Sequence, residues 1–338
     1  MSSIDKELTR ALSGQFTLAM GLNVQTSHKY IVLSDQHKGG GDKADEFRKC
    51  KQTYLAALEH YLQNGYTLVL LGDVEELWEQ SFGTVEKTYR EVLQKEGSFP
   101  PGHYYRIWGN HDDEWMREKN VRKKLAKYLP TGAIYEGIRF EVSNEAQALG
   151  TLLLLHGHQG TFASDKIRWF SRIAVRVYRY IQLWTGIGKT TPAKDACLRG
   201  EHDTQMYEWA ARQQNVILVA GHTHRPVWSS QTHLQKLQAE LQELKAGPDT
   251  PEQKELIRAK EQQIKEREGK YPPCEDTIKT IPCYFNTGCC RFDDGDITGI
   301  EIEDGNMRLI KWSGENLQRV ELESGKLTTL FEGIKQAR

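Results

Sequence analysis

The sequence predicts an α/β fold, and two kinds of pattern support this prediction. Five short apolar runs end abruptly at polar residues, which is typical of strands buried on both faces of a parallel sheet. Segments with the helical spacing of apolar residues lie between several of these runs. In chain order, the expected strands are 31–33, 67–71, 104–108, 152–155 and 216–220.

Each expected strand is followed at once by residues that can bind a metal ion. In chain order these are Asp35 and His37, Gly72-Asp73, Gly109-Asn110-His111-Asp112, His156-Gly157-His158, and Gly221-His222-Thr223-His224. In open α/β sheets ligands bind outside the carboxyl ends of the strands, so we expect these side chains to converge. The neighbouring glycines allow the backbone to approach closely. One acid at a strand end is typical of a turn or a helix cap, but five such ends together indicate a metal site.

Between and beyond these motifs the pattern predicts further elements. Residues 3–12 and 43–64 place apolar side chains on one helical face. The glycines of 39–41 form either a flexible loop or a cradle of backbone N–H groups for a phosphate. The tail 282–331 returns to strands, with a hairpin turn at Asp304-Gly305-Asn306.

Composition limits the possible functions and locations. The 338 residues include 45 basic and 46 acidic side chains, so no overall charge attracts nucleic acid. The six cysteines are scattered without a C-x-x-C pair, which is typical of a reducing cytoplasm. No signal peptide opens the sequence, and no apolar run approaches the ~20 residues that span a bilayer. We therefore expect a soluble, cytoplasmic protein.

The ordered motifs over residues 35–224 resemble those of the calcineurin-like metallophosphoesterases. The resemblance implies a four-layer α/β sandwich, in which helices flank two β-sheets and two metal ions lie at the strand ends. It implies that one ion is held by Asp35, His37, Asp73 and His224, and the other by Asp73, Asn110, His156 and His222. It also implies that His111 is the catalytic histidine and that Asp112 polarises it.

The expected ligands suit two divalent ions. Nitrogen and oxygen ligands without cysteine favour Mn²⁺, with Fe and Zn as alternatives. A carboxylate shared by ions about 4 Å apart is typical of two-metal hydrolysis, in which a bridging hydroxide attacks phosphorus. Histidine ordinarily titrates near neutral pH, so His111 suits protonation of the leaving oxygen.

The segment around the second motif narrows the resemblance. In Gly72-Asp73-Val74-Glu75-Glu76-Leu77-Trp78, the positions of Glu76 and Trp78 resemble the bacterial UDP-2,3-diacylglucosamine pyrophosphatase branch. The Gly-Asp-x-x-Asp-Arg-Gly and Gly-Asn-His-Glu signatures of serine/threonine phosphatases are absent. The branch usually has Gly-Asn-Arg-Asp where this sequence has Gly109-Asn110-His111-Asp112. The residue at the third position of this catalytic motif therefore differs. Trp78 either packs or meets substrate.

The remaining histidines carry weaker expectations. We expect His158 to face the substrate or to support His156, because it lies two residues beyond that expected ligand. Solvated or capping roles are expected for His60, His103, His202 and His233.

Two insertions are expected to decorate a single catalytic domain over 1–330. Residues 162–213 predict a helical lid, whose stretch 165–185 carries an apolar face and a stripe of arginines. That stretch either contacts an anionic membrane or a substrate's acyl or nucleotide part, or packs on the body. Residues 231–272 predict a helical hairpin that pairs within itself, dimerises or binds a partner protein.

The sequence thus predicts a metal-dependent phosphoester hydrolase of the phosphodiesterase or pyrophosphatase type. Its expected substrate is a phosphoester or pyrophosphate, nucleotide- or lipid-linked, and no nucleic-acid partner is indicated. A broad phosphomonoesterase or a cyclic-nucleotide phosphodiesterase is the alternative. A non-catalytic scaffold would have no need for seven ligands and His111.

Overall fold

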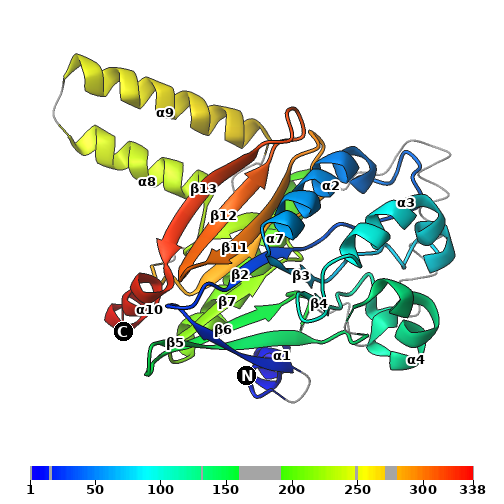
Figure 1. The fold of residues 1–338 in the computed structure, drawn as a ribbon. Helices are drawn as coiled ribbons and strands as arrows, with labels where there is room; N and C mark the ends of the chain where they lie inside the picture. Colours follow the sequence, from blue (N-terminus) through cyan, green and yellow to red (C-terminus); the bar gives the residue numbers. More distant parts are fainter. Residues whose placement is uncertain are drawn as a thin grey trace.

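Two mixed β-sheets packed between helices form the body of the protein (Figure 1). The computed structural model describes residues 2–14, 17–130, 132–159, 192–247, 250–270 and 280–337. The predicted α/β sandwich is therefore confirmed. The expected basic helix at 165–185, and the lid up to residue 191, lie outside the described residues.

The six-stranded sheet carries the first three motifs. Its order is β13-β12-β11-β2-β3-β4, and β2, β3 and β4 run parallel to one another. Their bounds are Lys29–Leu33 (β2), Thr67–Leu71 (β3), Tyr104–Ile107 (β4), Ile297–Glu303 (β11), Asn306–Trp312 (β12) and Arg319–Lys326 (β13). The expected turn between β11 and β12 is present, with left-handed backbone at Asp304 and Gly305.

The seven-stranded sheet carries the last two motifs. Its order is β1-β5-β6-β7-β10-β8-β9, and β6, β7 and β10 run parallel. Their bounds are Thr17–Asn23 (β1), Gly137–Asn144 (β5), Gln147–Leu155 (β6), Val216–Ala220 (β7), Pro226–Trp228 (β8), Gln231–Thr232 (β9) and Tyr284–Thr287 (β10).

Helices cover the outer faces of both sheets. Those on the six-stranded sheet are α2 (Phe47–Gln63) and α3 (Phe82–Glu96), followed by short turns at Asp113–Met116, α4 (Glu118–Asn120), Val121–Leu125 and Ala126–Tyr128. Those on the other sheet are α1 (Ser3–Leu12), α7 (Pro192–Arg212) and α10 (Leu327–Gln336). Among the described residues, no helix combines the length and the apolar content needed to cross a bilayer.

Strand β2 shows how one short run supports two cores. Successive side chains of a strand point to opposite faces of the sheet. Tyr30 and Val32 accordingly join the core between the sheets, whereas Ile31 and Leu33 join the core beneath α2 and α3. Burial on both faces explains why this strand is apolar throughout and changes to polar residues only at its end.

The loop before α2 contains the glycines of 39–41, for which a flexible loop or a phosphate-binding cradle was expected. The Asp45 carboxylate accepts hydrogen bonds from the backbone N–H groups of Gly39 (3.2 Å) and Gly41 (2.7 Å) and from the Tyr89 hydroxyl (2.6 Å). These two amides are therefore already bonded within the protein. This loop also explains why the helix expected over 43–64 begins only at Phe47.

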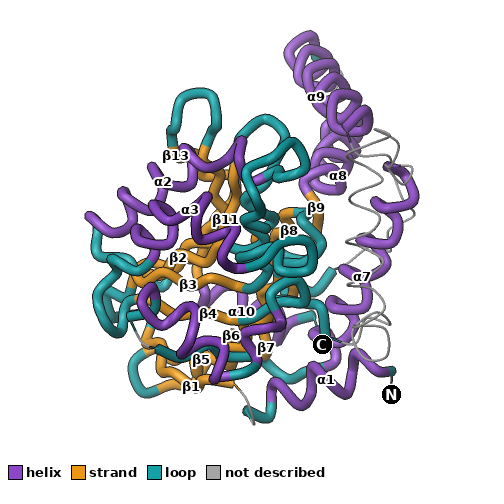
Figure 2. The backbone as a smooth tube through the Cα atoms, turned by 90° about the vertical axis from the view of Figure 1, so that its right-hand side faces the viewer, coloured by secondary structure: helices purple, strands orange, loops and turns teal. Residues whose placement is uncertain are grey.

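Two long helices, α8 (His233–Ala246) and α9 (Pro251–Lys270), project from the body and lie side by side (Figures 1 and 2). Ion pairs join them, from Lys260 to Glu240 (2.6 Å) and from Lys245 to Glu261 (2.7 Å). Leu256 on α9 is 55% exposed. Ion pairs thus contribute to the contact between the helices, while Leu237 on α8 and Ile264 on α9 are buried.

We predict that Arg319→Met lowers the free energy of unfolding by about 3 kcal/mol, because it leaves the buried Glu301 carboxylate without its cation. Arg319 donates to both Glu301 oxygens, at 2.7 and 2.5 Å, and Tyr61 of α2 donates to one of them at 2.7 Å. Chemical denaturation would measure the loss, and the metal content should not change.

The matched control is Arg308→Met on the neighbouring strand. Arg308 pairs with the partly exposed Glu303 at 3.2 Å, so its loss should cost less than about 1 kcal/mol. Equal losses of unfolding free energy in the two variants would contradict the larger cost expected for removing the cation that pairs with Glu301.

Candidate metal centre

The loops that follow β2 and β3 are held together beyond the ends of their strands. The backbone N–H of Asp35 donates to Gly72 O (3.1 Å), and that of His37 donates to Asp73 O (2.9 Å). The bridge between Lys38 and Glu75 continues the same parallel pairing. This pairing fixes the first two motifs beside each other.

Five of the seven expected ligands have left-handed backbone, which is uncommon outside glycine. Their φ angles are 54° at Asp35, 48° at His37, 50° at Asp73, 68° at His222 and 58° at His224. Such strained residues cluster at functional sites, where the surrounding structure holds them in place. Here the left-handed turn lets a chain leave its strand sharply, so that side chains from different strands reach a common point.

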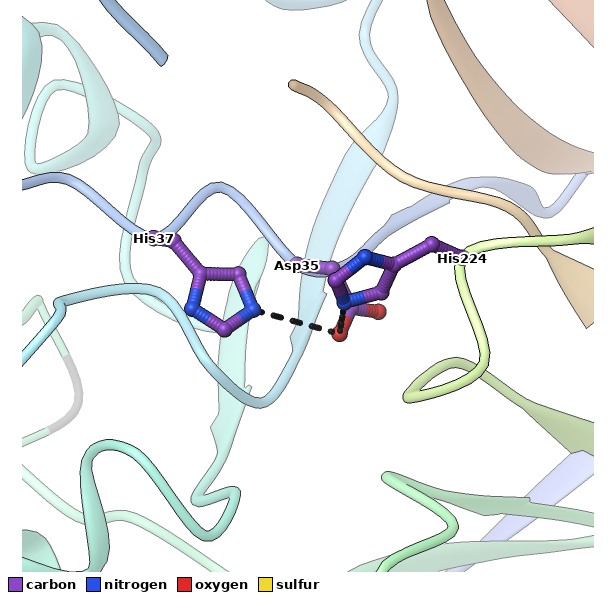
Figure 3. A group of neighbouring side chains, drawn as sticks. All are labelled: Asp35, His37 and His224. Atoms are coloured by element: carbon purple, nitrogen blue, oxygen red, sulfur yellow. Dashed lines mark ion pairs between the residues drawn. The ribbon is translucent and has the colours of Figure 1, made fainter. Parts of the chain in front are cut away.

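Asp35, His37 and His224 form the first group of converging side chains (Figure 3). The Asp35 Oδ1 atom lies 3.0 Å from His224 Nε2 and 3.7 Å from His37 Nε2. His37 Nε2 also lies 3.6 Å from Asp73 Oδ2. The bridging carboxylate expected from the sequence therefore lies next to this group.

Asp73, His156 and His222 form the second group. His156 Nε2 lies 3.1 Å from Asp73 Oδ2, and its Nδ1 donates to Leu71 O at 2.8 Å. That hydrogen bond leaves the Nε2 lone pair facing Asp73, as metal ligation requires. The backbone N–H of His222 donates to Asp35 Oδ2 at 2.9 Å, which joins the two sheets at the site.

Two glycines provide space for this approach. A Cβ atom at Gly72 would lie 2.6 Å from the His156 ring, and Gly72 also has a φ of 87°. A Cβ atom at Gly109 would collide with the Asp73 carboxylate. Both positions therefore require glycine for space, and Gly72 requires it for conformation as well.

The third motif lies against the bridging carboxylate. The backbone N–H of His111 donates to Asp73 Oδ1 at 2.8 Å, and this bond places Asn110 beside Asp73. The Asn110 Oδ1 atom is buried. All seven expected ligands thus come from the carboxyl ends of β2, β3, β4, β6 and β7, and both sheets contribute to the site.

The donor atoms fit divalent cations. Buried polar side-chain atoms rarely lack a hydrogen-bond partner in folded proteins. Five of the buried atoms that lack one among the described residues lie at this site. They are Asp35 Oδ1, His37 Nε2, Asp73 Oδ2, Asn110 Oδ1 and His156 Nε2. Unpaired oxygen and imidazole nitrogen atoms that point toward one another form a suitable ligand set for Mn²⁺, Fe or Zn.

The pKa values of the converging side chains also indicate a site that attracts positive charge. Burial raises the pKa of the Asp73 carboxyl, but His156 and the other nearby histidines hold it well below its ordinary value. Burial lowers the pKa of His156, yet the Asp73 and Asp35 carboxylates raise it to about 9. Without metal, protons on imidazole thus supply the positive charge that these ionised carboxylates require.

One carboxylate, Glu76, contacts both His37 and His111. Its Oε2 lies 2.8 Å from His37 Nδ1, and its Oε1 lies 2.7 Å from His111 Nδ1. Burial raises the pKa of Glu76, but His111 and His37 hold it well below its ordinary value, so the carboxylate accepts from both rings. Trp78 stacks on the His111 ring, with centroids 4.3 Å apart and an interplanar angle of 21°.

The expectation that Asp112 polarises His111 is wrong in this structure. The Asp112 carboxylate accepts from the backbone N–H groups of Gly109 (2.6 Å) and Val74 (3.0 Å) and from Arg106 (3.2 Å). Asp112 therefore folds the third motif back onto β3, and Glu76 occupies the position beside His111 Nδ1.

Buried charges support the loops from behind. Lys38 donates to both oxygens of Glu96, at 2.7 and 2.9 Å, and Arg106 pairs with Glu75. Trp115 Nε1 also donates to Glu75, at 2.9 Å. Each charge in this group has an opposite partner, which buried charges require.

Further residues lie at the site, and of those that follow only His158 was expected there. His202, for which a solvated or capping role was expected, donates instead to Gly157 O at 2.6 Å, and its ring lies 5.1 Å from that of His222. The His158 ring lies 5.4 Å from that of His156, beside the expected ligand. Asn286 Nδ2 donates to Gly221 O at 2.7 Å and so fixes the loop that carries the fifth motif.

Comparison with known proteins gives one family. A sequence model described as calcineurin-like phosphoesterase matches residues 28–226. A search of curated proteins found no match to the sequence.

Several solved structures show distant likeness. A conserved uncharacterised protein of Streptococcus pneumoniae TIGR4, titled a predicted phosphoesterase, is 12% identical with a TM-score of 0.29, and the match covers 88% of this chain and 98% of that one. Vacuolar protein sorting 29 of Cryptosporidium parvum is 10% identical with a TM-score of 0.37, over 89% and 98%. A cold-active protein-tyrosine phosphatase of Shewanella is 13% identical with a TM-score of 0.35, over 90% and 83%.

We predict that Glu76→Gln weakens metal binding by about 10–100-fold, because a glutamine amide offers one acceptor oxygen where two imidazole N–H groups need one each. When the glutamine oxygen accepts from His111, the His37 ring must either leave its Nδ1–H without an acceptor or change tautomer, which turns a protonated Nε2 toward the metal. Metal titration followed by mass spectrometry of bound metal would measure the effect.

Glu114→Gln serves as the control, since Glu114 pairs with Lys124 away from the ligands. Undiminished metal affinity in the Glu76 variant would show that the double contact of Glu76 has no role in holding His37.

Proposed function

Because the chain belongs to the calcineurin-like phosphoesterase family, we propose that it is a hydrolase that cleaves phosphoesters with two divalent metal ions. The observation that carries the proposal is the convergence of buried, unpartnered donor atoms at the ends of strands from both sheets. A scaffold would have no need for this ligand set, nor for a histidine oriented beside it.

The ligands are proposed to divide between two ions. Asp35, His37, Asp73 and His224 would hold one, and Asp73, Asn110, His156 and His222 the other. When bound, such ions neutralise phosphoryl oxygens and lower the pKa of water toward neutrality. Mn²⁺ is the proposed ion, with Fe and Zn as alternatives.

The protein's own residues would then position and protonate the substrate. Glu76 accepts from His111 Nδ1, so His111 Nε2 is the atom that gives a proton to the leaving oxygen. Trp78 stacked on the ring restricts its rotation. Asp112 acts as a positioning residue that holds the backbone at Gly109.

We propose a phosphodiesterase or pyrophosphatase rather than a phosphomonoesterase. Support comes from Glu76 and Trp78, whose spacing after Asp73 resembles the UDP-2,3-diacylglucosamine pyrophosphatase branch and which both contact His111. The substrate would therefore be nucleotide- or lipid-linked. A broad phosphomonoesterase or cyclic-nucleotide phosphodiesterase remains the second candidate.

The location, contacts and domain organisation of the protein stay predictions. We propose a cytoplasmic location, a membrane contact through 165–185, and a partner or dimer contact through 231–272. We also propose a single domain over 1–330 with its lid at 162–213.

We predict that Asp73→Ala removes metal from both positions, because Asp73 contacts both groups of ligands. His111→Ala should keep its metal and lower kcat by about 10²–10⁴-fold, which is the usual contribution of general acid catalysis. Metal analysis and steady-state kinetics on the same preparations would separate the two effects. Loss of metal from the His111 variant would overturn the division between ligands and acid.

Hydrolysis of bis-p-nitrophenyl phosphate and p-nitrophenyl phosphate by chelator-stripped protein resupplied with Mn²⁺ tests the proposed activity. We expect metal-dependent turnover with a preference for the diester. Preference for the monoester would favour the second candidate, and no metal-dependent turnover of either ester would contradict the proposed hydrolase.

A further inference from the structure

We propose that Arg291 forms an anion subsite beside the metal ligands, which binds the second, non-reacting phosphoryl group of a substrate with a diphosphate linkage. The inference rests on the proposed function, since it assigns a substrate class to that site. It follows from the position of Arg291 in the fold, its partial exposure and the charges around it.

The backbone places Arg291 next to the first group of ligands. It follows the end of β10, where the backbone N–H of Cys290 donates to Asp35 O at 3.4 Å. The Arg291 side chain pairs with Glu46 at 3.1 Å, just before α2. The Arg291 side chain is 24% exposed and that of Glu46 is 46% exposed, so their ion pair is partly open to solvent.

The segment from β10 to Arg291 runs along the strand ends that carry the expected ligands. Asn286 Nδ2 donates to Gly221 O at 2.7 Å, beside His222, and the Cys290 N–H reaches Asp35 O on the other sheet. Arg291 thus lies on the flank of the centre that contains Asp35.

The chemistry of the side chain suits an anion. Guanidinium forks match phosphate oxygens in bidentate geometry, so Arg291 suits a phosphoryl group on this flank.

The alternative is that Arg291 only pairs with Glu46. Ion pairs between exposed side chains contribute little to stability, and Glu46 is nearly half exposed. A guanidinium beside a site for two divalent cations also experiences like-charge repulsion, which an anionic ligand relieves. A phosphomonoester places its one phosphoryl group at the ions, whereas a diphosphate diester carries a second anion to the flank.

Binding of two matched probes to the metal-loaded, full-length protein tests the inference. The P,P′-dimethyl ester of methylenediphosphonate carries two phosphorus centres joined by a P–C–P link that resists hydrolysis. Dimethyl phosphate carries one. Titration calorimetry would give both affinities without depending on turnover.

We expect Arg291→Met to weaken the diphosphonate by about 10–100-fold, the loss typical of one charged contact, and to leave dimethyl phosphate within about twofold. The affinity of Arg291→Lys for the diphosphonate should fall between those of wild type and Arg291→Met. The lysine variant replaces the methionine variant in the test if the latter fails to fold. Glu46→Gln should tighten the diphosphonate, because it releases Arg291 from a competing carboxylate. Arg212→Met, which breaks the ion pair between Arg212 of α7 and Asp5 of α1, is the control and should change neither affinity.

Two results would overturn the subsite. Unchanged affinity for the diphosphonate in Arg291→Met, with the same loss of stability as in Glu46→Gln, would show a structural ion pair only. Equal weakening of both probes would place Arg291 at the reacting phosphoryl group. Failure of the proposed hydrolase would appear separately, as absent turnover of the aryl esters by wild-type protein, and the probe affinities would still decide the subsite.

Discussion

The two buried carboxylates Asp35 and Asp73 are the constraint on which the surrounding structure depends. Removing a carboxylate from water costs several kcal/mol unless opposite charge is supplied. Backbone N–H groups of His222 and His111 satisfy one oxygen of each, but the other oxygen of each faces only imidazole. The site is therefore organised to receive cations. Both the left-handed turns and the glycines serve this convergence.

A second set of charges holds that geometry in place. Left-handed backbone at five ligand positions is unfavourable by itself, so the neighbouring structure must hold it. Pairing between Lys38, Glu75, Glu96 and Arg106 anchors the loops after β2 and β3 to each other, to α3 and to β4. Glu76 extends this support to His37 and His111, so a ligand and the proposed acid share one anchor.

What the sequence could predict follows from how local each signal is. The polar residues that converge at the strand ends were recognisable because an apolar run and the residues after it are adjacent in the chain, as at Val69–Asp73. The partner of His111 was not recognisable from the sequence. The path of the loop after β3 decides that Glu76, rather than Asp112, reaches the His111 ring. Arg291 and His202 lie outside every motif, and only the packing of the segment after β10 and of α7 brings them beside the site.

The position of the centre between the sheets couples metal binding to the fold. The first group takes Asp35 and His37 from the six-stranded sheet and His224 from the other, and the second combines Asp73 with His156 and His222. Each ion would therefore bind to both sheets at once. A ligand that binds only the folded state stabilises it, and here it would do so across the interface between the sheets. The same contacts that prepare the chemistry would hold the two halves of the sandwich in register.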